Sequence, residues 1–349
     1  MSDLKINNIT NRVGDSGPVI AGVSTVTGTG AFTVPVGPTE FRGGRGRGIV
    51  GGGRNNPSPA VAEVTIDMHE IATTGNATDF GDMITSNTGA KGGCGSATRA
   101  ILAGGYNPSP GALLTQIAYV VMSSQGGAND FGDLQTAKNG ITPASNNTRG
   151  ILQGGATPDY TSVMTSINVQ SLGNDSSYGS ALEGAIRNGA AAQNTTRGLF
   201  GGGQGPSANY FTIVSYEFAT AGTGTKFGEL SDDPSSLAAV SSGIRGVWAG
   251  GSAPSVTNTI EYVTIATEGN ATDFGDLTVA RRNLAGCTNR IRGTFLGGNT
   301  QPSGSGNNVN TIDYITITST GNATDFGDLT VVRRCSNAGG SDAHGGLGD

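Results

Sequence analysis

The string GNATDFGD occupies residues 75–82 and occurs again, unchanged, at 269–276 and 321–328. An Asp-Phe-Gly triplet holds a magnesium ion in protein kinases, where it works together with a lysine strand, a His-Arg-Asp loop and a glycine-rich phosphate loop. None of these accompanying motifs is present in this sequence. The repetition of the string therefore indicates an internal repeat and does not indicate a kinase.

A second signature gives the length of the repeat. It consists of an arginine, a small residue, two residues that are mostly large and apolar, and then glycines, as in Arg47-Gly-Ile-Val-Gly-Gly-Gly. Successive arginines are 47 to 52 residues apart, so the chain contains six units of about fifty residues. The units begin near Arg47, Arg99, Arg149, Arg197, Arg245 and Arg292.

Each unit has the pattern of about four short strands. The glycines are followed by a polar loop and then by a strand in which apolar and polar residues alternate, most clearly at 259–265 and 311–317. A Gly-Asn-Thr turn, the Asp-Phe-Gly-Asp stretch and a run of small residues complete the unit. No window shows the 3.6-residue period of a helix. Four strands at a period near fifty predict an all-β fold, a six-bladed β-propeller.

The double glycine after an apolar second strand resembles the kelch and galactose-oxidase class of propellers, whose repeat is also about fifty residues long. The resemblance covers residues 43–349 and implies a kelch-like propeller domain. The tryptophan near the end of a kelch blade is missing, and another aromatic residue takes its place in every unit. We expect these aromatic residues to be structural and to pack one blade against the next. They are Phe80, Phe131, Tyr178, Phe227, Phe274 and Phe326.

The residues around the aromatic position show that the packing residues of the string are kept in every unit, whereas its charged residues are not. Asp79 and Asp82 of the first unit become Ser177 and Ser180 in the third unit, whereas the aromatic residue and the glycine after it are present in all six. The arginine is also present in all six units, so an ion pair with these acids is not its only purpose. One interpretation is that its guanidinium donates to backbone carbonyls at the turn between the first and second strands. The other is a ring of six cations near one mouth of the central channel that binds an anion.

A near copy of one segment indicates how the ring closes. Leu277-Thr-Val-Ala-Arg-Arg precedes the sixth arginine signature, and Leu329-Thr-Val-Val-Arg-Arg follows the sixth unit without a further signature after it. We expect residues 335–344 to supply the innermost strand of the first blade, beside Arg47–Gly53. Such pairing removes the open sheet edge that a linear array would leave.

Residues 1–42 do not fit the repeat and read as a short extended anchor segment. Its extended pieces at 4–9, 18–26 and 31–36 cannot bury much apolar area alone, so we expect them to pair with a neighbouring chain or another protein. The sequences Leu4-Lys-Ile-Asn-Asn-Ile-Thr-Asn-Arg and Ser16-Gly-Pro-Val-Ile-Ala-Gly-Val resemble the leaders of structural proteins of tailed phages, particularly phages of marine bacteria. This resemblance implies attachment to other virion proteins and, as is common for fibres, a homotrimer.

Composition excludes several classes of protein. The net charge of −6 argues against a nucleic-acid surface, which requires clustered Lys and Arg. No apolar run is long enough to span a membrane, and we expect no membrane insertion. Three cysteines without metal-site spacing predict free thiols.

No set of catalytic residues stands out, and we expect no enzymatic activity, cofactor or metal. A copper radical site of the galactose-oxidase type needs two histidines with two tyrosines and a Tyr–Cys link, but His69 and His344 lack suitable partners and are expected on the surface or on strand faces. Ser-x-Asp boxes of the sialidase type are missing. A glycosidase remains an alternative, because two carboxylates can converge from any two loops.

Taken together, these patterns predict a non-enzymatic structural protein of a phage virion, exposed on the particle as a tail or neck fibre, an appendage or a head decoration. Loops between the second and third strands, for instance Gln204–Asn209 and Thr300–Asn310, would contact other proteins or host-surface glycans. A carbohydrate-active enzyme at the channel mouth and an architectural spacer without a ligand are the alternatives.

Overall fold

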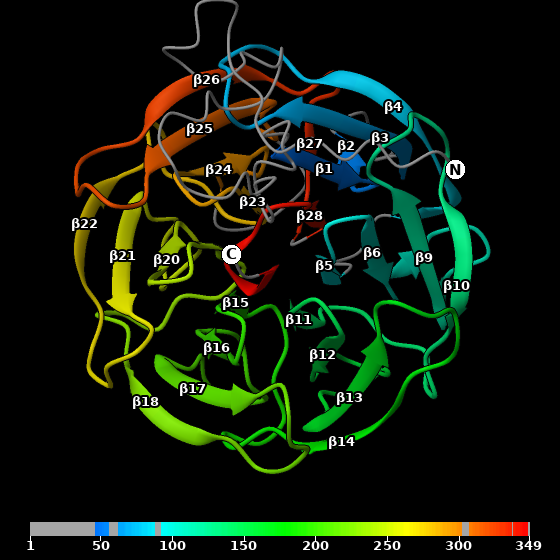
Figure 1. Cartoon of the computed structure of the whole chain (residues 1–349), viewed down its shortest axis with the longest axis horizontal. Coiled ribbons are helices and arrows are strands. Elements are labelled where there is room, and N and C mark those ends of the chain that lie inside the picture. The colour runs from blue at the N-terminus through cyan, green and yellow to red at the C-terminus, as the bar shows by residue number, and fades with distance from the viewer. Residues whose placement is uncertain (1–45, 56–61, 88–91, 302–306, 337, 348–349) are drawn as a thin grey trace, which may run out of the picture.

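The computed structural model describes residues 46–55, 62–87, 92–301, 307–336 and 338–347. The predicted all-β, six-bladed propeller is confirmed: six four-stranded antiparallel sheets surround a central axis, and the C-terminal end of the chain lies near that axis (Figure 1). The anchor expected at residues 1–42 lies outside the described residues.

Each blade consists of four strands that succeed one another from the axis outward. In that order, blade 1 contains β28 (Gly339–Ser341), β1 (Arg47–Gly51), β3 (Glu63–Glu70) and β4 (Thr78–Asn87). Blade 2 contains β5 (Gly92–Gly95), β6 (Arg99–Ala103), β9 (Gln116–Val121) and β10 (Asn129–Asp133). Blade 3 contains β11 (Thr142–Ser145), β12 (Arg149–Gln153), β13 (Val163–Asn168) and β14 (Ser176–Ser180).

The second half of the ring follows the same order. Blade 4 contains β15 (Ala190–Gln193), β16 (Arg197–Gly201), β17 (Thr212–Glu217) and β18 (Thr225–Glu229). Blade 5 contains β19 (Ala238–Ser241), β20 (Arg245–Ala249), β21 (Thr259–Thr264) and β22 (Thr272–Asp276). Blade 6 contains β23 (Ala285–Thr288), β24 (Arg292–Leu296), β25 (Thr311–Thr316) and β26 (Thr324–Asp328).

Two short strand pairs and one short helix of the described structure lie outside the blades. β2 (Arg54–Asn55) pairs with β27 (Arg333–Arg334), and β7 (Tyr106–Asn107) pairs with β8 (Ala112–Leu113). The short 3₁₀ helix η2 (Gly345–Leu347) follows β28. No helix in the described part of the chain is long or apolar enough to cross a bilayer.

The double glycine ends the second strand of every blade for a conformational reason. In blade 1, Gly52 and Gly53 have φ angles of 70° and 112°, which favour glycine because it has no Cβ. The N–H of Gly53 then donates to the carbonyl of Asn87, at the start of the segment that leads into blade 2. The second glycine of each of the other blades makes the same bond to the chain entering the next blade. This turn therefore links successive blades.

The repeated string lies at the seams between blades. In five of the six seams, the N–H of the glycine that opens the turn before an outer strand donates to the carbonyl of the aromatic residue in the preceding blade; the Gly75–Phe326 distance is 2.9 Å. The glycine after the aromatic residue faces the same turn, and a Cβ at Gly132 would lie 2.4 Å from the carbonyl oxygen of Gly173. The two ends of the string thus meet between neighbouring blades, which explains why the chain repeats it.

The aromatic residue itself occupies a β-bulge of the outer strand. The pairing of β9 with β10 shifts between Asp130 and Gly132, so Phe131 is the extra residue, and the other five blades show a similar shift. All six aromatic side chains are between 2% and 4% exposed. They lie within the hydrophobic clusters that fill the blades and their seams.

The ring closes where the C-terminal segment joins blade 1. β28, which lies within the expected stretch 335–344, pairs antiparallel with β1, with Ile49 opposite Gly340. Asp342 continues the match, because its Oδ1 accepts the N–H of Arg47 at 2.8 Å. In the other five blades an Asn or Ser three residues before the arginine accepts the same N–H. Asp342 therefore takes the place of that residue in blade 1, although 295 residues separate it from Arg47.

Candidate functional site

The six arginines of the repeat lie in the seams between blades. Arg149 begins β12, and its Nη1 donates to the carbonyl of Phe218 in blade 4 at 2.7 Å. Four others reach the chain after the third strand of the next blade in the same way, with Nη1–O distances of 2.6, 3.1, 3.0 and 2.9 Å for Arg47, Arg99, Arg245 and Arg292. Arg197 instead pairs with Glu217 of its own blade at 3.3 Å.

The carbonyls that receive these bonds differ from the expected ones. The sequence interpretation placed them at the turn between the first and second strands, whereas they follow the third strand of the neighbouring blade. Three of the arginines also stack on a tyrosine of their own third strand, for example Arg245 on Tyr262 at 4.5 Å. None of the six lines the cavity on the axis. Anion binding by this ring stays a prediction.

The central axis itself offers little space. The innermost strands place small residues there, among them Gly93, Pro143, Ala191, Ala239 and Gly286, and the cavities between them measure about 30 and 50 Å³. A Cβ at Gly93 would lie 2.1 Å from the carbonyl oxygen of Gly339. Strands with glycine or another small residue at these points can approach one another, and the axis has no room for a sugar ring.

The C-terminal segment covers the mouth of the axis on the face that carries the arginines. Nε2 of His344 lies 3.0 Å from the carbonyl oxygen of Gly95, and its Nδ1 accepts the N–H of Gly346 at 3.1 Å. A Cβ at Gly346 would lie 2.0 Å from the carbonyl oxygen of Ser145. Burial lowers the pKa of His344 to about 4, so the imidazole is neutral near pH 7.

Neither histidine is on the surface. His69 lies in β3 with its Nε2 2.9 Å from Oγ1 of Thr294, and burial lowers its pKa to about 4 as well. The cysteines are buried free thiols, as expected from their spacing. Within the described ranges no group of three or more His, Cys, Asp or Glu could hold a metal ion.

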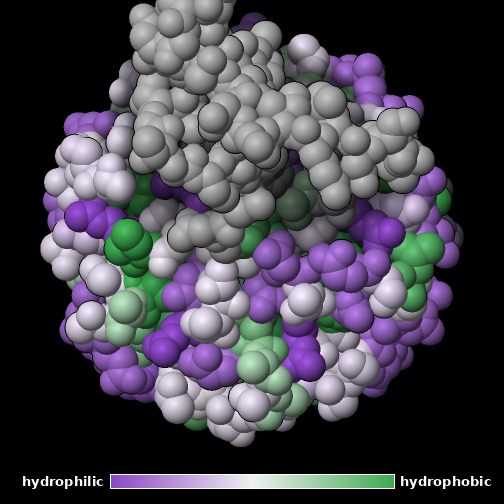
Figure 2. Space-filling model, in the orientation of Figure 1, coloured by the Kyte–Doolittle hydropathy of each residue, from purple (hydrophilic) through white to green (hydrophobic). Residues whose placement is uncertain are grey.

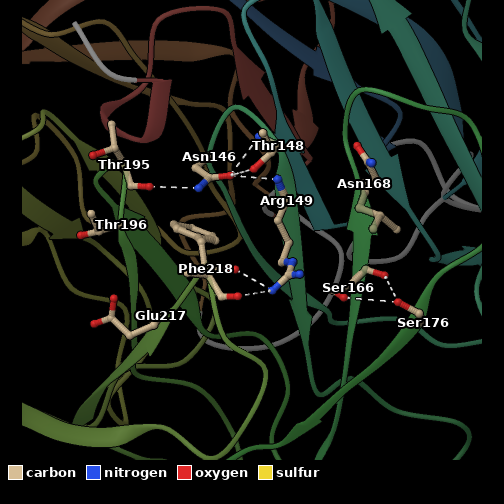
Figure 3. A pocket seen from close by; sticks show the side chains of 12 residues that line it. Asn146, Thr148, Arg149, Ser166, Asn168, Ser176, Thr195, Thr196, Glu217 and Phe218 are labelled. Carbon is tan, nitrogen blue, oxygen red and sulfur yellow. Dashed lines mark hydrogen bonds between the residues drawn. The ribbon is translucent and has the colours of Figure 1, made fainter.

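A groove near the arginines lies at the seam between blades 3 and 4 and has a volume of about 640 Å³ (Figure 3). Hydroxyl and amide groups form most of its lining. Its polar side chains are Asn146, Thr148, Arg149, Ser166, Asn168, Ser176, Thr195, Thr196 and Glu217. We call this hollow the seam groove.

Small residues in blade 3 open the seam groove. Ser166 lies opposite Ile151 in the pairing of β12 with β13, and the same position holds Tyr119, Tyr262 and Tyr314 in blades 2, 5 and 6. Those tyrosines lie beneath an arginine and pack edge-on against the outer aromatic residue. Replacing such a ring by serine removes that volume and leaves a polar floor.

The seam between blades 3 and 4 also differs from the other five seams in the hydrogen bonds at its outer strands. It is the one seam where the described structure has no bond from the opening glycine of the turn to the preceding aromatic carbonyl. The hydroxyl of Tyr178 instead donates to the carbonyls of Glu217 and Thr220 at 2.7 and 3.0 Å. Burial raises the pKa of this phenol to about 12, so Tyr178 stays a donor.

The charges in the seam groove come from one cation and one acid. Nη1 of Arg149 is held by carbonyls of blade 4, and within the described structure its Nε and Nη2 donate to no other residue. Glu217 is half exposed and pairs with Arg197. The groove can therefore donate and accept hydrogen bonds around a hydroxyl-rich ligand, but it presents only a single carboxylate.

Two features near the seams were not anticipated from the sequence. Arg281 pairs with Asp313 at 3.0 Å and Arg333 pairs with Asp67 at 2.9 Å, and all four side chains are fully buried. The arginines come from the two near-copied segments, so the duplicated Arg-Arg was the available signal. Of the loops expected to make contacts, Gln204–Asn209 is exposed at its tip, and 302–306 of the second loop lie outside the described residues.

Comparison with known proteins assigns no family. No protein-family model matches the chain, and no curated protein matches it.

Proposed function

We propose that this chain is a non-enzymatic, kelch-like propeller that binds a glycan in the seam groove and displays that site on the outside of a phage particle. Residues 1–42 would attach it to other virion proteins, and their resemblance to fibre leaders favours a trimer. The placement on a virion is supported by the resemblance of 4–12 and 16–23 to phage leaders.

The observation that carries the glycan proposal is the seam groove. A sugar ring presents hydroxyl groups that both donate and accept, and a lining of Ser, Thr and Asn side chains beside Arg149 complements them. Its volume of about 640 Å³ is in the range of small-molecule sites. The face drawn in Figure 2 shows hydrophobic residues only as separate small patches on its coloured part, which favours a polar ligand there.

Binding fits this groove better than hydrolysis. Most glycoside hydrolases use two carboxyl groups about 5 to 10 Å apart, one on each side of the scissile bond. Glu217 is the only acid among the residues that line the groove, and it pairs with Arg197. The axis, where an enzyme at the channel mouth would work, is narrow and covered by the C-terminal segment.

A glycan array combined with a turnover assay tests the proposal. Ser176→Trp fills the groove from β14, and Thr272→Trp makes the same change at the same position of blade 5. We expect binding of intact glycan by the wild type and by Thr272→Trp, and loss of binding by Ser176→Trp.

The other outcomes decide between the alternatives. Released sugar would establish an enzyme, and no retained glycan on any protein would establish a spacer. Mass spectrometry of purified particles tests the location separately, because absence of the chain from virions would overturn the assignment to the particle.

A further inference from the structure

Three arginines converge on the face of the disc opposite the C-terminal segment. β1 runs from Arg47 toward this face, and Arg54 follows the double glycine at its end. Arg54 pairs directly with Arg334 between β2 and β27. Side chains directly opposite in an antiparallel pair project from the same side of the ribbon, with Cα atoms only about 5 Å apart. Two guanidinium groups are thus held together by backbone pairing.

The third cation, Arg282, joins them from the segment that enters blade 6. It forms a β-bridge with Asn299, and its Nε donates to the carbonyl of Gln301 at 2.9 Å. Asn299 in turn donates to Asn308, whose amide donates to the carbonyl of Arg54 at 2.8 Å. The hydrogen-bonded asparagines therefore fix Arg282 beside the other two.

This cluster has no counter-charge in the described structure. None of the ion pairs there includes Arg54, Arg282 or Arg334. Glu63, whose N–H donates to the carbonyl of Gly53 just before Arg54, accepts a hydrogen bond from Asn55. Nε of Arg54 and Nε of Arg334 are both buried without a hydrogen-bond partner.

The lowered pKa of Arg334 shows that this arrangement disfavours the charged form of its guanidinium. Burial first, and then the charges of Arg54 and Arg282, lower the pKa of its guanidinium to about 10. A chain whose net charge is −6 has no general excess of cations to explain such a group. Like charges held at short range by the backbone are stabilised by an anion between them.

We propose that Arg54, Arg282 and Arg334 form a binding site for an oxyanion of the phosphate or sulfate type, separate from the seam groove. Guanidinium groups match such oxygens with paired, charge-assisted hydrogen bonds. The site accepts the free ion or the same group carried on a polymer, and the test distinguishes these two sources.

A matched position in blade 4 supports the assignment and supplies a control. Arg187 is the counterpart of Arg282, because each forms the β-bridge to the residue after a double glycine. Arg187 is already satisfied: Nη2 donates to Oε1 of Gln204 at 3.1 Å, and its guanidinium lies 4.6 Å from the ring of Tyr160. The blade 6–blade 1 junction keeps the cation without such partners.

The experiment is titration calorimetry of the full chain with inorganic phosphate, against sodium chloride at equal ionic strength. We expect phosphate to bind and to raise the melting temperature more than chloride does. Arg282→Gln and Arg334→Gln each remove charge-assisted bonds and should weaken phosphate binding about tenfold or more, whereas Arg187→Gln should leave it unchanged. Melting without phosphate checks that the variants fold; relief of repulsion should leave Arg334→Gln at least as stable as the wild type.

The outcomes that overturn the proposal are specific. Equal effects of phosphate and chloride would mean simple screening, and an equal loss in Arg187→Gln would mean that the cluster is not the site. With dextran sulfate and neutral dextran as further ligands, tighter binding of dextran sulfate than of free sulfate identifies a polymer-borne group, and equal affinity per sulfate identifies the free ion.

Discussion

A single added carbon atom has no room at the glycine that follows the aromatic residue of each outer strand. In blade 4 the Cβ of an alanine at Gly228 would lie 1.9 Å from the carbonyl oxygen of Gly269 in blade 5. The Cβ is fixed to the main chain of blade 4 and the oxygen belongs to the main chain of blade 5, so neither can move without loosening the seam. The close approach of blades, and not turn conformation alone, requires glycine here.

Gly228→Ala should lower the free energy of unfolding by about 2 kcal/mol or more, as overpacking does elsewhere. Gly243→Ala is the matched control, because a Cβ there meets nothing within 4 Å, and it should change stability by less than about 0.5 kcal/mol. Urea denaturation of both variants measures the difference, and equal stabilities would show that the blades are less tightly apposed at their seams.

The two histidines should remain neutral well below pH 6. Burial lowers the pKa of both His69 and His344 to about 4, below the value of 6.5 in the unfolded chain. Their contribution to stability is therefore complete above pH 6.5 and is lost as the pH falls toward 4. NMR titration of the imidazole signals checks this, and titration of either ring near pH 6.5 would contradict its burial.

Single residues were easier to place from the sequence than their partners. The aromatic residues and the glycines after them are written in every unit, and their burial follows from that pattern. The partners of the arginines cannot be read from the sequence, because five of the six donate to main-chain carbonyls of the next blade, and any residue type supplies a carbonyl. Only the register between blades reveals the acceptor.

At the scale of an element, the closing strand β28 is followed by Asp342, an acid whose charged form is disfavoured by burial. Burial raises the pKa of Asp342 to about 6, although its Oδ1 accepts the N–H of Arg47. A carboxyl whose pKa rises on folding stabilises the fold at low pH, and this contribution is lost as the pH rises from about 4 through 6. Asparagine keeps the acceptor without the charge.

Asp342→Asn should therefore raise the free energy of unfolding at pH 7, by at most on the order of 3 kcal/mol. The gain should disappear near pH 4, where the wild-type carboxyl is protonated. Asp232→Asn, at an exposed position, is the control. Denaturation of the three proteins at pH 4 and pH 7 measures the effect, and a loss of stability at pH 7 in Asp342→Asn would count against it.

A second contribution at this scale is the buried ion pair between Arg333 of β27 and Asp67 of β3 in blade 1. Arg333 binds Asp67 and also donates to the carbonyl of Thr65 at 2.7 Å, so it joins β27 to β3. Asp67→Ala leaves a buried cation without its partner and should cost about 3–5 kcal/mol.

The matched control for this pair is on the surface. Glu229→Ala breaks the exposed pair with Lys226 and should cost less than about 1 kcal/mol. Thermal and urea unfolding of both variants test the comparison, and similar losses would show that Arg333 finds another partner.

The seam groove shows what element-level reasoning missed. Ser166 lines it at the position where three other blades have tyrosine, and blade 4 has Ser215 there. That substitution is visible once the third strands are aligned in register, but the third unit is also the one whose acids around Tyr178 are replaced by serine. The deviation of a unit from its repeat, and not the repeat itself, was the signal for the site.

At the scale of the whole molecule, the period of the repeat predicts the number of blades, and the near-copied segment predicts where the chain returns. Each blade makes similar contacts with the next, so a linear array would leave the edge of β1 unpaired. β28 covers that edge from the other end of the sequence. The cluster of Arg54, Arg282 and Arg334 was not predicted from the sequence, because these residues come from three segments that meet only when the ring of blades closes.

The most direct test of the closed ring is an NMR measurement of the contact between β1 and β28. Bonds at 47–342 and 51–338 make Val50 and Gly339 a pair that is not hydrogen-bonded, so their Hα atoms face each other at close range. A sample with protonated valine and glycine in a deuterated background should show a strong Hα–Hα nuclear Overhauser effect between these residues. Its absence, with rapid exchange of the Ile49 amide, would contradict the closure of the six blades by the C-terminal strand.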